Sequence, residues 1–275
     1  MGLRINTNLA AMTASRVLQN SSIEQAKSFQ RLSSGKRIVN AGDDAAGMSI
    51  SENLHAQIRS LSQAERNAND GISFVQVAEG GLNEVGNILI RMRELAIQAA
   101  SDTIGDTERG FINKEIQSLK QEVDRIADVT NFNGTNLLNG QADKELHFHV
   151  GAGKNDQIML DPSKFNVKTD NIGIDGIEYT SIDSARDALD NIDGAISKVM
   201  GARAELGANQ NKLQSTISNL SIQKENYSAA RSRIADTDIA AETSNLVRGN
   251  ILQSAGVAVL GQANLAPQAA LRLLG

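Results

Sequence analysis

The sequence of 275 residues contains no cysteine, no tryptophan and only two prolines, and aromatic residues make up 3% of it. Without cysteine the chain has no disulfides, no thiol chemistry and no cysteine-ligated zinc. With so few aromatic side chains, packing has to rest on Leu, Ile, Val, Ala and Met. This composition suits narrow helical seams better than a broad globular core.

The chain also lacks a run of basic residues, and its net charge is −5. A nucleic-acid partner is therefore not expected, because such partners require a concentrated positive surface. The N-terminus has no apolar region typical of a secretory signal. The most apolar stretch, residues 257–274, is interrupted by Gln262, Asn264, Pro267, Gln268 and Arg272, so no membrane partner is expected either.

What the chain does have is a long row of small or apolar residues, almost unbroken, at alternating steps of three and four. Such a row is the a/d seam of a heptad pattern, and here it continues far beyond the few repeats needed to predict a coiled coil. At about 1.5 Å per residue, the helix would be roughly 78 Å long. The positions are Gly47, Ile50, Leu54, Gln57, Leu61, Ala64, Ala68, Gly71, Val75, Ala78, Leu82, Val85, Leu89, Met92, Ala96 and Ala99.

A second row of the same length lies toward the other end of the chain. Two equal stripes indicate an intramolecular antiparallel pair rather than two unrelated amphipathic helices, because matched length and unbroken register rarely coincide. Leu89 and Leu213 are then expected to be buried in the shared seam. The second row consists of Ile182, Ala185, Leu189, Ile192, Ile196, Val199, Arg203, Leu206, Gln210, Leu213, Ile217, Leu220, Lys224, Tyr227, Arg231 and Ile234.

Shorter helices are expected around these two. Residues 3–33 form a weak amphipathic pattern, and a glycine-punctuated loop follows, from which Asp43 or Asp44 can cap the first long helix. Asp106 or Thr107 can cap a third helix. Its apolar stripe consists of Ile112, Ile116, Leu119, Val123 and Ile126.

The middle of the chain predicts a small amount of β structure. Asn133-Gly134 and Asn139-Gly140 mark turns, and residues 146–150 and 157–160 alternate as the two strands of a hairpin. Residues 161–179 look irregular or extended. Thr180 and Asp183 then form a capping-box pattern for the second long helix.

His147 and His149 lie on one face of the first predicted strand. Two imidazoles on one face are able to bind a metal ion, but the sequence names no third ligand, so solvent-exposed histidines are the preferred interpretation. No metal, no cofactor and no catalytic group is assigned.

The last segment, from Asp238 to Leu274, carries another thin stripe, which Pro267 is expected to kink or interrupt. Because the antiparallel pair returns the chain to its start, the two terminal segments can form a coiled coil with each other. Their stripes are thin, so we expect them to become stable only when neighbouring molecules bury the remaining apolar surface. The candidate assembly residues are Ile5, Leu9, Met12, Val247, Ile251, Val257, Leu260 and Leu265.

The fold class expected is therefore mainly α. It is a long antiparallel helical rod, similar to a coiled-coil bundle, with a small β-hairpin region and with terminal helices that form a coiled coil. Two domains are expected. Residues 1–42 and 237–275 form a terminal coiled-coil domain, which includes the glycine-punctuated loop that leads into the rod (the spoke loop). Residues 43–236 form a rod domain. The rod domain includes the hairpin region, residues 140–180.

Three motifs near the ends of the chain resemble those of bacterial flagellins. They are NTNLAAM at residues 6–12, RLSSGKRIVNAGDDAAGMSI at residues 31–50 and ARSRIADTDIAAETSNL at residues 230–246. The resemblance implies a secreted, extracellular structural subunit that polymerises with itself into the flagellar filament. Its inner core would be the terminal coiled coil.

Further partners follow from the same resemblance. They are the flagellar export chaperone, the cap protein and the hook-filament junction proteins, and export through the flagellar channel would account for the missing signal peptide. The interval 131–180 holds little beyond the hairpin, so the chain resembles a minimal flagellin without a large outer domain. A junction protein is the first alternative. A metallopeptidase-bearing member is the second, but H-E-x-x-H is absent.

Residues 89–101, LIRMRELAIQAAS, resemble the flagellin patch that the vertebrate Toll-like receptor recognises. The resemblance assigns Arg91, Leu95 and Glu115 to this receptor and to the axial contact between subunits. Arg91 and Leu95 are four residues apart and lie off the predicted seam, so both are expected to face outward.

Overall fold

The computed structural model describes residues 7–140 and 145–272, with side chains described as far as residue 265. The chain divides into two compact units. The terminal unit contains Met1–Ile58 and Asn226–Gly275, and the rod unit contains Arg59–Glu225. These divisions fall within two long helices, α2 (Ala45–Ala99) and α5 (Ile182–Ala235).

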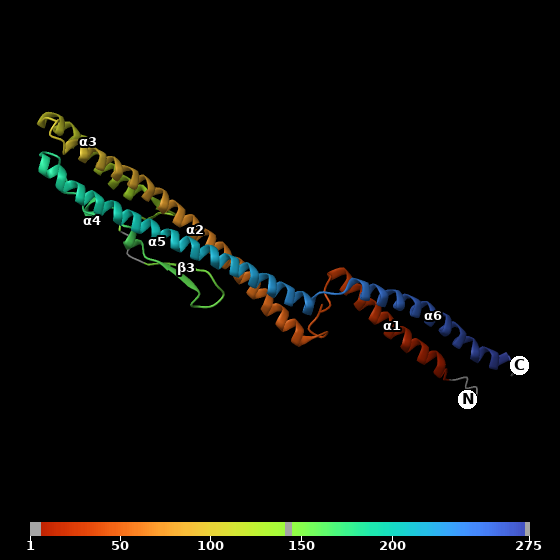
Figure 1. Cartoon of the computed structure of the whole chain (residues 1–275). Coiled ribbons are helices and arrows are strands. Elements are labelled where there is room, and N and C mark those ends of the chain that lie inside the picture. Colours follow the sequence, from red (N-terminus) through yellow and green to blue (C-terminus); the bar gives the residue numbers. More distant parts are fainter. Residues whose placement is uncertain (1–6, 141–144, 273–275) are drawn as a thin grey trace. The chain divides into compact units, whose positions relative to one another are not determined.

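Within the rod unit, α2 and α5 run side by side in opposite directions (Figure 1). Three ion pairs fix this direction, because residue numbers rise along one helix as they fall along the other. They are Arg93–Asp193 at 2.6 Å, Glu79–Arg203 at 3.8 Å and Glu65–Lys224 at 2.5 Å. The predicted antiparallel pair is confirmed.

The seam predicted on α2 is buried at every position from Leu61 to Ala99. Leu89 is 0% and Leu213 is 1% exposed, as expected. On α5 the buried row differs in part from the predicted one. Ala188, Ala195 and Ala202 are buried, and the predicted neighbours of the first two, Leu189 and Ile196, are only half-buried at the edge of the core.

Helix α3 (Asp106–Val129) packs Ile112, Ile116 and Val123 into the same core. Neither predicted cap is correct, because Gly105 is the N-cap and makes no side-chain capping bond. Asp106 instead accepts a hydrogen bond from Arg109 at 2.9 Å.

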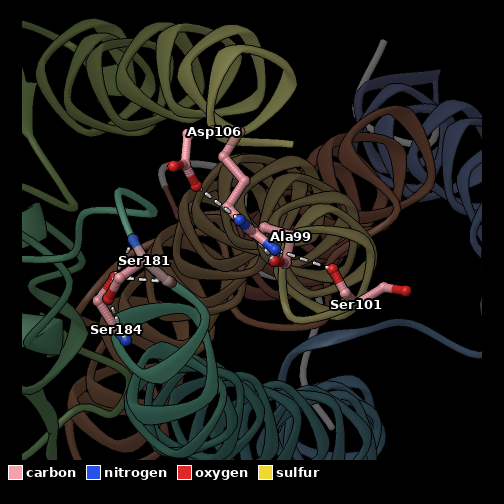
Figure 2. Close-up of polar contacts among 6 residues, drawn as sticks. Ala99, Ser101, Asp106, Ser181 and Ser184 are labelled. Carbon is pink, nitrogen blue, oxygen red and sulfur yellow. Dashed lines mark hydrogen bonds and ion pairs between the residues drawn. The ribbon is translucent and has the colours of Figure 1, made fainter. Parts of the chain in front are cut away.

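The buried side chain of Arg109 joins α3 to the end of α2. Figure 2 labels its three partners, Asp106, Ala99 and Ser101. Its Nε donates to the carbonyl oxygen of Ala99 and its Nη2 to that of Ser101, both at 3.0 Å. A helix leaves its last carbonyls without partners inside the helix. Arg109 therefore stabilises the end of α2 from the neighbouring helix.

Helix α5 begins with a reciprocal capping box, one residue later than predicted. Ser181 Oγ accepts from the backbone N–H of Ser184 at 3.1 Å, and Ser184 Oγ accepts from that of Ser181 at 3.0 Å (Figure 2). Ser181 and Ser184 therefore form the capping box that was predicted for Thr180 and Asp183. A hydroxyl at each position is sufficient for both bonds.

Two antiparallel strand pairs follow α3, β1 (Asn131–Phe132) with β2 (Thr135–Asn136) and β3 (Leu146–His149) with β4 (Gln157–Leu160). The first turns at Asn133 and Gly134, where both φ angles are positive, as a tight Asn-Gly turn requires. The second is the predicted hairpin, and its apolar side packs on α2 through Phe148 and Phe74, with ring centroids 5.7 Å apart.

The segment between β4 and α5 is irregular, one of the two forms expected for it, and it is not extended. It contains a 3-10 turn, η1 (Pro162–Phe165), and a single helical turn, α4 (Thr169–Ile172). Phe165, Ile174 and Tyr179 are almost fully buried. The apolar residues here are spaced two apart only in short pairs whose register shifts, so periodicity did not predict that this segment packs on the rod core.

The terminal unit pairs α1 (Leu9–Ser34) with α6 (Ile239–Arg272), and Figure 1 shows the two side by side. Asn8 and Asp238 cap them, and the backbone of α6 remains helical through position 267 as far as Arg272. The predicted interruption at Pro267 is therefore absent from this described backbone.

The loop between α1 and α2 is held by hydrogen bonds to the end of α5 and the residues after it. Gly35, with φ of 67°, ends α1, and its carbonyl accepts from the N–H of Thr237 at 3.0 Å. The N–H of Arg37 donates to the carbonyl of Ala235 at 2.7 Å. Of the two predicted caps of α2, Asp44 is the correct one, since it accepts from the N–H of Gly47 at 2.8 Å.

The buried seam generates a direct test. Leu89→Ala should lower the free energy of unfolding by about 2–5 kcal/mol, because it leaves a cavity in the core. Its neighbour Ile90 is 47% exposed, so Ile90→Ala is the matched control. We expect the control to change the free energy by about 0.5 kcal/mol or less. Urea unfolding of the monomer measures both, and equal effects would contradict the seam.

Candidate assembly and recognition surfaces

Small and polar residues make up most of the seam of the terminal pair, together with three leucines. The less exposed positions of each helix follow alternating steps of three and four, so each helix turns one heptad row toward its partner. On α1 this row is Ala11, Ala14, Leu18, Ser21, Gln25 and Ser28. On α6 it is Leu246, Gly249, Gln253, Gly256, Leu260 and Ala263.

Specific contacts confirm this pairing. Asn8 Nδ2 donates to the carbonyl of Ala263 at 2.8 Å, and Gln25 donates to the side chain of Asn250. A Cβ atom at Gly256 would lie 3.1 Å from Leu18 Cδ1. The glycine therefore allows the two helices to approach closely.

Most of the candidate assembly residues lie outside this seam. Leu9 is 69% exposed, Met12 is 62% and Ile251 is 63%. Val247, Val257 and Leu265 are also exposed, whereas Leu260 is half-buried on the α1 side, and Ile5 lies outside the described residues. Sequence reasoning missed further exposed apolar side chains, namely Val17, Ile23, Phe29, Ile239, Leu252 and Val259.

Some of these side chains line an apolar groove along the terminal pair. Leu9, Ala14 and Val17 come from α1, and Leu252 and Val259 come from α6. Monomeric soluble proteins seldom leave such contiguous apolar surface in water. The groove is therefore a candidate contact surface for another chain.

The groove continues into a polar region near the start of α6. Arg31 lies 4.0 Å from the carboxylates of both Asp43 and Glu242, too far for a hydrogen bond but close enough for ion pairing. The backbone N–H groups of Asn40 and then Val39 donate to Asp43, and these bonds lower the pKa of its carboxyl group.

In the rod unit, Arg91 forms a polar cluster with Glu94 and Glu115, here called the Arg91 cluster. Its Nη2 and Nε donate to Glu115 Oε1 at 3.0 and 3.2 Å, and its Nη1 donates to Glu94 at 3.2 Å. The bond to Glu115, then that to Glu94, raises the pKa of the guanidinium. All three side chains remain about half exposed, so the cluster is available to a partner.

Leu95 does not share that surface, contrary to the expectation. It is 2% exposed and belongs to the rod core. The prediction treated α2 as half of a two-helix pair, with one narrow seam. Helix α3 adds a second partner, which widens the buried face of α2 to include Leu95. Arg91 and Glu115 are brought together, and Leu95 is separated from them.

His147 and His149 lie on the exposed face of β3, and His55 belongs to the other unit. Within the described residues, no group of three or more His, Cys, Asp or Glu side chains is arranged to hold a metal ion. Over the same residues, none of the helices is long and apolar enough to cross a membrane.

Two family models match the chain. The bacterial flagellin N-terminal helical region matches residues 5–143, and the bacterial flagellin C-terminal helical region matches residues 189–274. The two matched regions together include both helices of the terminal pair and all three residues of the Arg91 cluster.

Relatives match nearly from end to end. A flagellin of Halalkalibacterium halodurans is 45% identical over 98% of this chain and 99% of its own length. A flagellin of Bacillus subtilis is 42% identical over 99% of this chain and all of its own. A flagellar filament core protein of Treponema maltophilum is 40% identical over 98% and 99%.

Solved structures agree with the fold. The crystal structure of Bacillus cereus flagellin covers 56% of this chain and 88% of its own, with 30% identity and a TM-score of 0.52. A structure described as a flagellar hook-associated protein from Vibrio parahaemolyticus covers 70% of this chain and 100% of its own. Its identity is 18% and its TM-score 0.60, so it supports the fold alone.

Proposed function

This chain belongs to the bacterial flagellin family and is a structural subunit of the extracellular flagellar filament, and we propose that it assembles through the exposed apolar side chains of α1 and α6. The observation that carries this proposal is the seam between these helices. It consists mostly of small and polar residues, and it leaves Leu9, Met12 and Ile251 in solvent. Burying such side chains against other subunits is favourable.

The proposal assigns separate roles to separate segments. Residues 1–42 and 237–275 provide contacts between subunits, and residues 43–236 provide a rod whose core is complete within one chain. The interval between α3 and α5 contains only the two short strand pairs, η1 and α4 among its described residues. The chain is a minimal member of the family without a large outer domain.

Substitution at Ile251 tests the assembly surface. Ile251→Asp should prevent polymerisation but leave the monomer folded, because the side chain is 63% exposed in the single chain and would become buried only on assembly. Sedimentation and electron microscopy after induced polymerisation measure assembly, and circular dichroism measures folding.

The matched control is Met159→Asp in the hairpin, where the parent side chain is also 63% exposed. We expect this variant to assemble like the parent. Filaments formed normally by Ile251→Asp would contradict the proposed surface, as would equal loss of assembly in both variants.

The Arg91 cluster is proposed as a second contact surface, used both by the next subunit and by the vertebrate Toll-like receptor for flagellin. Its support is the exposed Arg91 between two carboxylates, at positions that resemble the family's recognition patch. Leu95 is not part of this proposal, because its burial prevents direct contact.

Arg91→Ala should weaken both receptor signalling and polymerisation, since the two partners would share one surface. Arg93→Ala is the matched control, because Arg93 lies on the same helix and loses a comparable exposed ion pair, that with Asp193. A cellular reporter for the receptor and a sedimentation assay measure the two effects. Loss of signalling with normal assembly would contradict the shared surface, and unchanged signalling would contradict the receptor assignment.

The remaining partners proposed are the export chaperone, the cap protein and the hook-filament junction proteins. The exposed apolar side chains of α6 are a surface that a chaperone would need to cover before assembly. The family role is structural, and we propose no catalytic activity for this chain.

A further inference from the structure

The outward face of the β3–β4 hairpin has no role in the proposed assembly. Its inward face packs Phe148, Ile158 and Leu160 on the rod core. The outward face carries His147, His149, Gln157 and Met159. Met159 is 63% exposed although its side chain is apolar.

The strand register places Met159 of β4 on the same face as the two histidines of β3 and directly beside one of them. His147 is directly opposite Met159, and His149 is directly opposite Gln157. The N–H of Val150 donates to the carbonyl of Asp156, directly opposite it, at 2.9 Å. Hydrogen-bonded and non-bonded pairs alternate along an antiparallel ladder. His147 and Met159 are therefore a non-bonded pair, the type in which opposing side chains lie closest.

Contacts between β3 and α2 hold this face of the hairpin in place. Phe148, between the two histidines, packs against Phe74 of α2. The carbonyl of His149 accepts a hydrogen bond from Asn67 Nδ2 of α2 at 2.9 Å. The strand is therefore anchored to the rod at Phe148 and at His149, and this fixes the backbone that carries the imidazoles.

We propose that His147, His149 and Met159 bind a single monovalent copper ion on this face. Imidazole nitrogens bind several transition metals, and a thioether sulfur is a soft ligand that selects copper(I). The sequence alone showed the two histidines of one strand. The third ligand is a methionine on the other strand, and only the register places it beside His147. The site is independent of filament assembly.

The test uses the full-length monomer under anaerobic conditions, with copper(I) supplied from a complex with the chelator bathocuproine disulfonate. His147→Asn and His149→Asn should each weaken copper(I) binding by about tenfold or more, since even outer-shell changes at metal sites cost that much. Met159→Leu should weaken copper(I) binding similarly but leave nickel(II) binding, which needs only the imidazoles, unchanged.

His55→Asn and Met200→Leu are the matched controls, because they remove a histidine of α2 and an exposed methionine of α5 that are not part of the proposed site. Both should bind copper(I) like the parent. Parent-like binding by the double variant His147→Asn/His149→Asn would overturn the site. Parent-like copper(I) binding by Met159→Leu would overturn the thioether ligand and the preference for copper(I). Circular dichroism verifies folding of each variant.

Discussion

The buried row along α2 is the constraint on which the rod unit depends. From Leu61 to Ala99 each of its predicted positions is shielded from water. A row this long needs partners on more than one side, and α3, α5 and the segment before α5 provide them. Ion pairs at the edges of the α2–α5 contact agree with the antiparallel direction, but their side chains are partly exposed and add little free energy. Stability therefore comes mainly from the apolar row.

The terminal pair, in contrast to the rod unit, leaves most of its large apolar side chains exposed. Its seam contains Gly249, Gly256 and several serines and glutamines, which bring the helices close but bury little apolar area. The larger apolar side chains, such as Leu9 and Ile251, remain exposed. In the proposed assembly, contacts with other copies would contribute much of the stability of this unit, and by mass action that contribution would grow with subunit concentration. The rod unit would then be complete in a single chain, and the terminal unit would be completed by assembly.

Periodicity predicted what depends on a sustained row of apolar or small residues at regular spacing. The α2 seam, the α3 stripe and the β3–β4 hairpin are of this kind. It failed where polar residues interrupt the row, where small residues have larger neighbours, or where the spacing is irregular. The α1–α6 seam consists largely of residues that hydropathy ignores, and Ala188 and Ala195 replace the larger neighbours expected on α5. The buried residues between Asp161 and Tyr179 alternate only over short runs, such as 165–169 and 172–174, and the register shifts between runs, so no regular element is predicted. Leu95 belongs to a core with more than two elements, which reasoning from a two-helix pair omitted.

The burial of Leu95 changes what the Arg91 cluster can contribute to binding. Exposed charges orient a partner and speed its approach more than they add affinity. Affinity at this surface therefore has to come from apolar area near the cluster, and Leu95 no longer supplies it. Phe111 lies one helical turn before Glu115 on α3 and is 64% exposed, so it shares the face of Glu115. A partner that engaged Arg91 and Glu115 would therefore find its apolar contact at Phe111, whereas Leu95 belongs to the rod core.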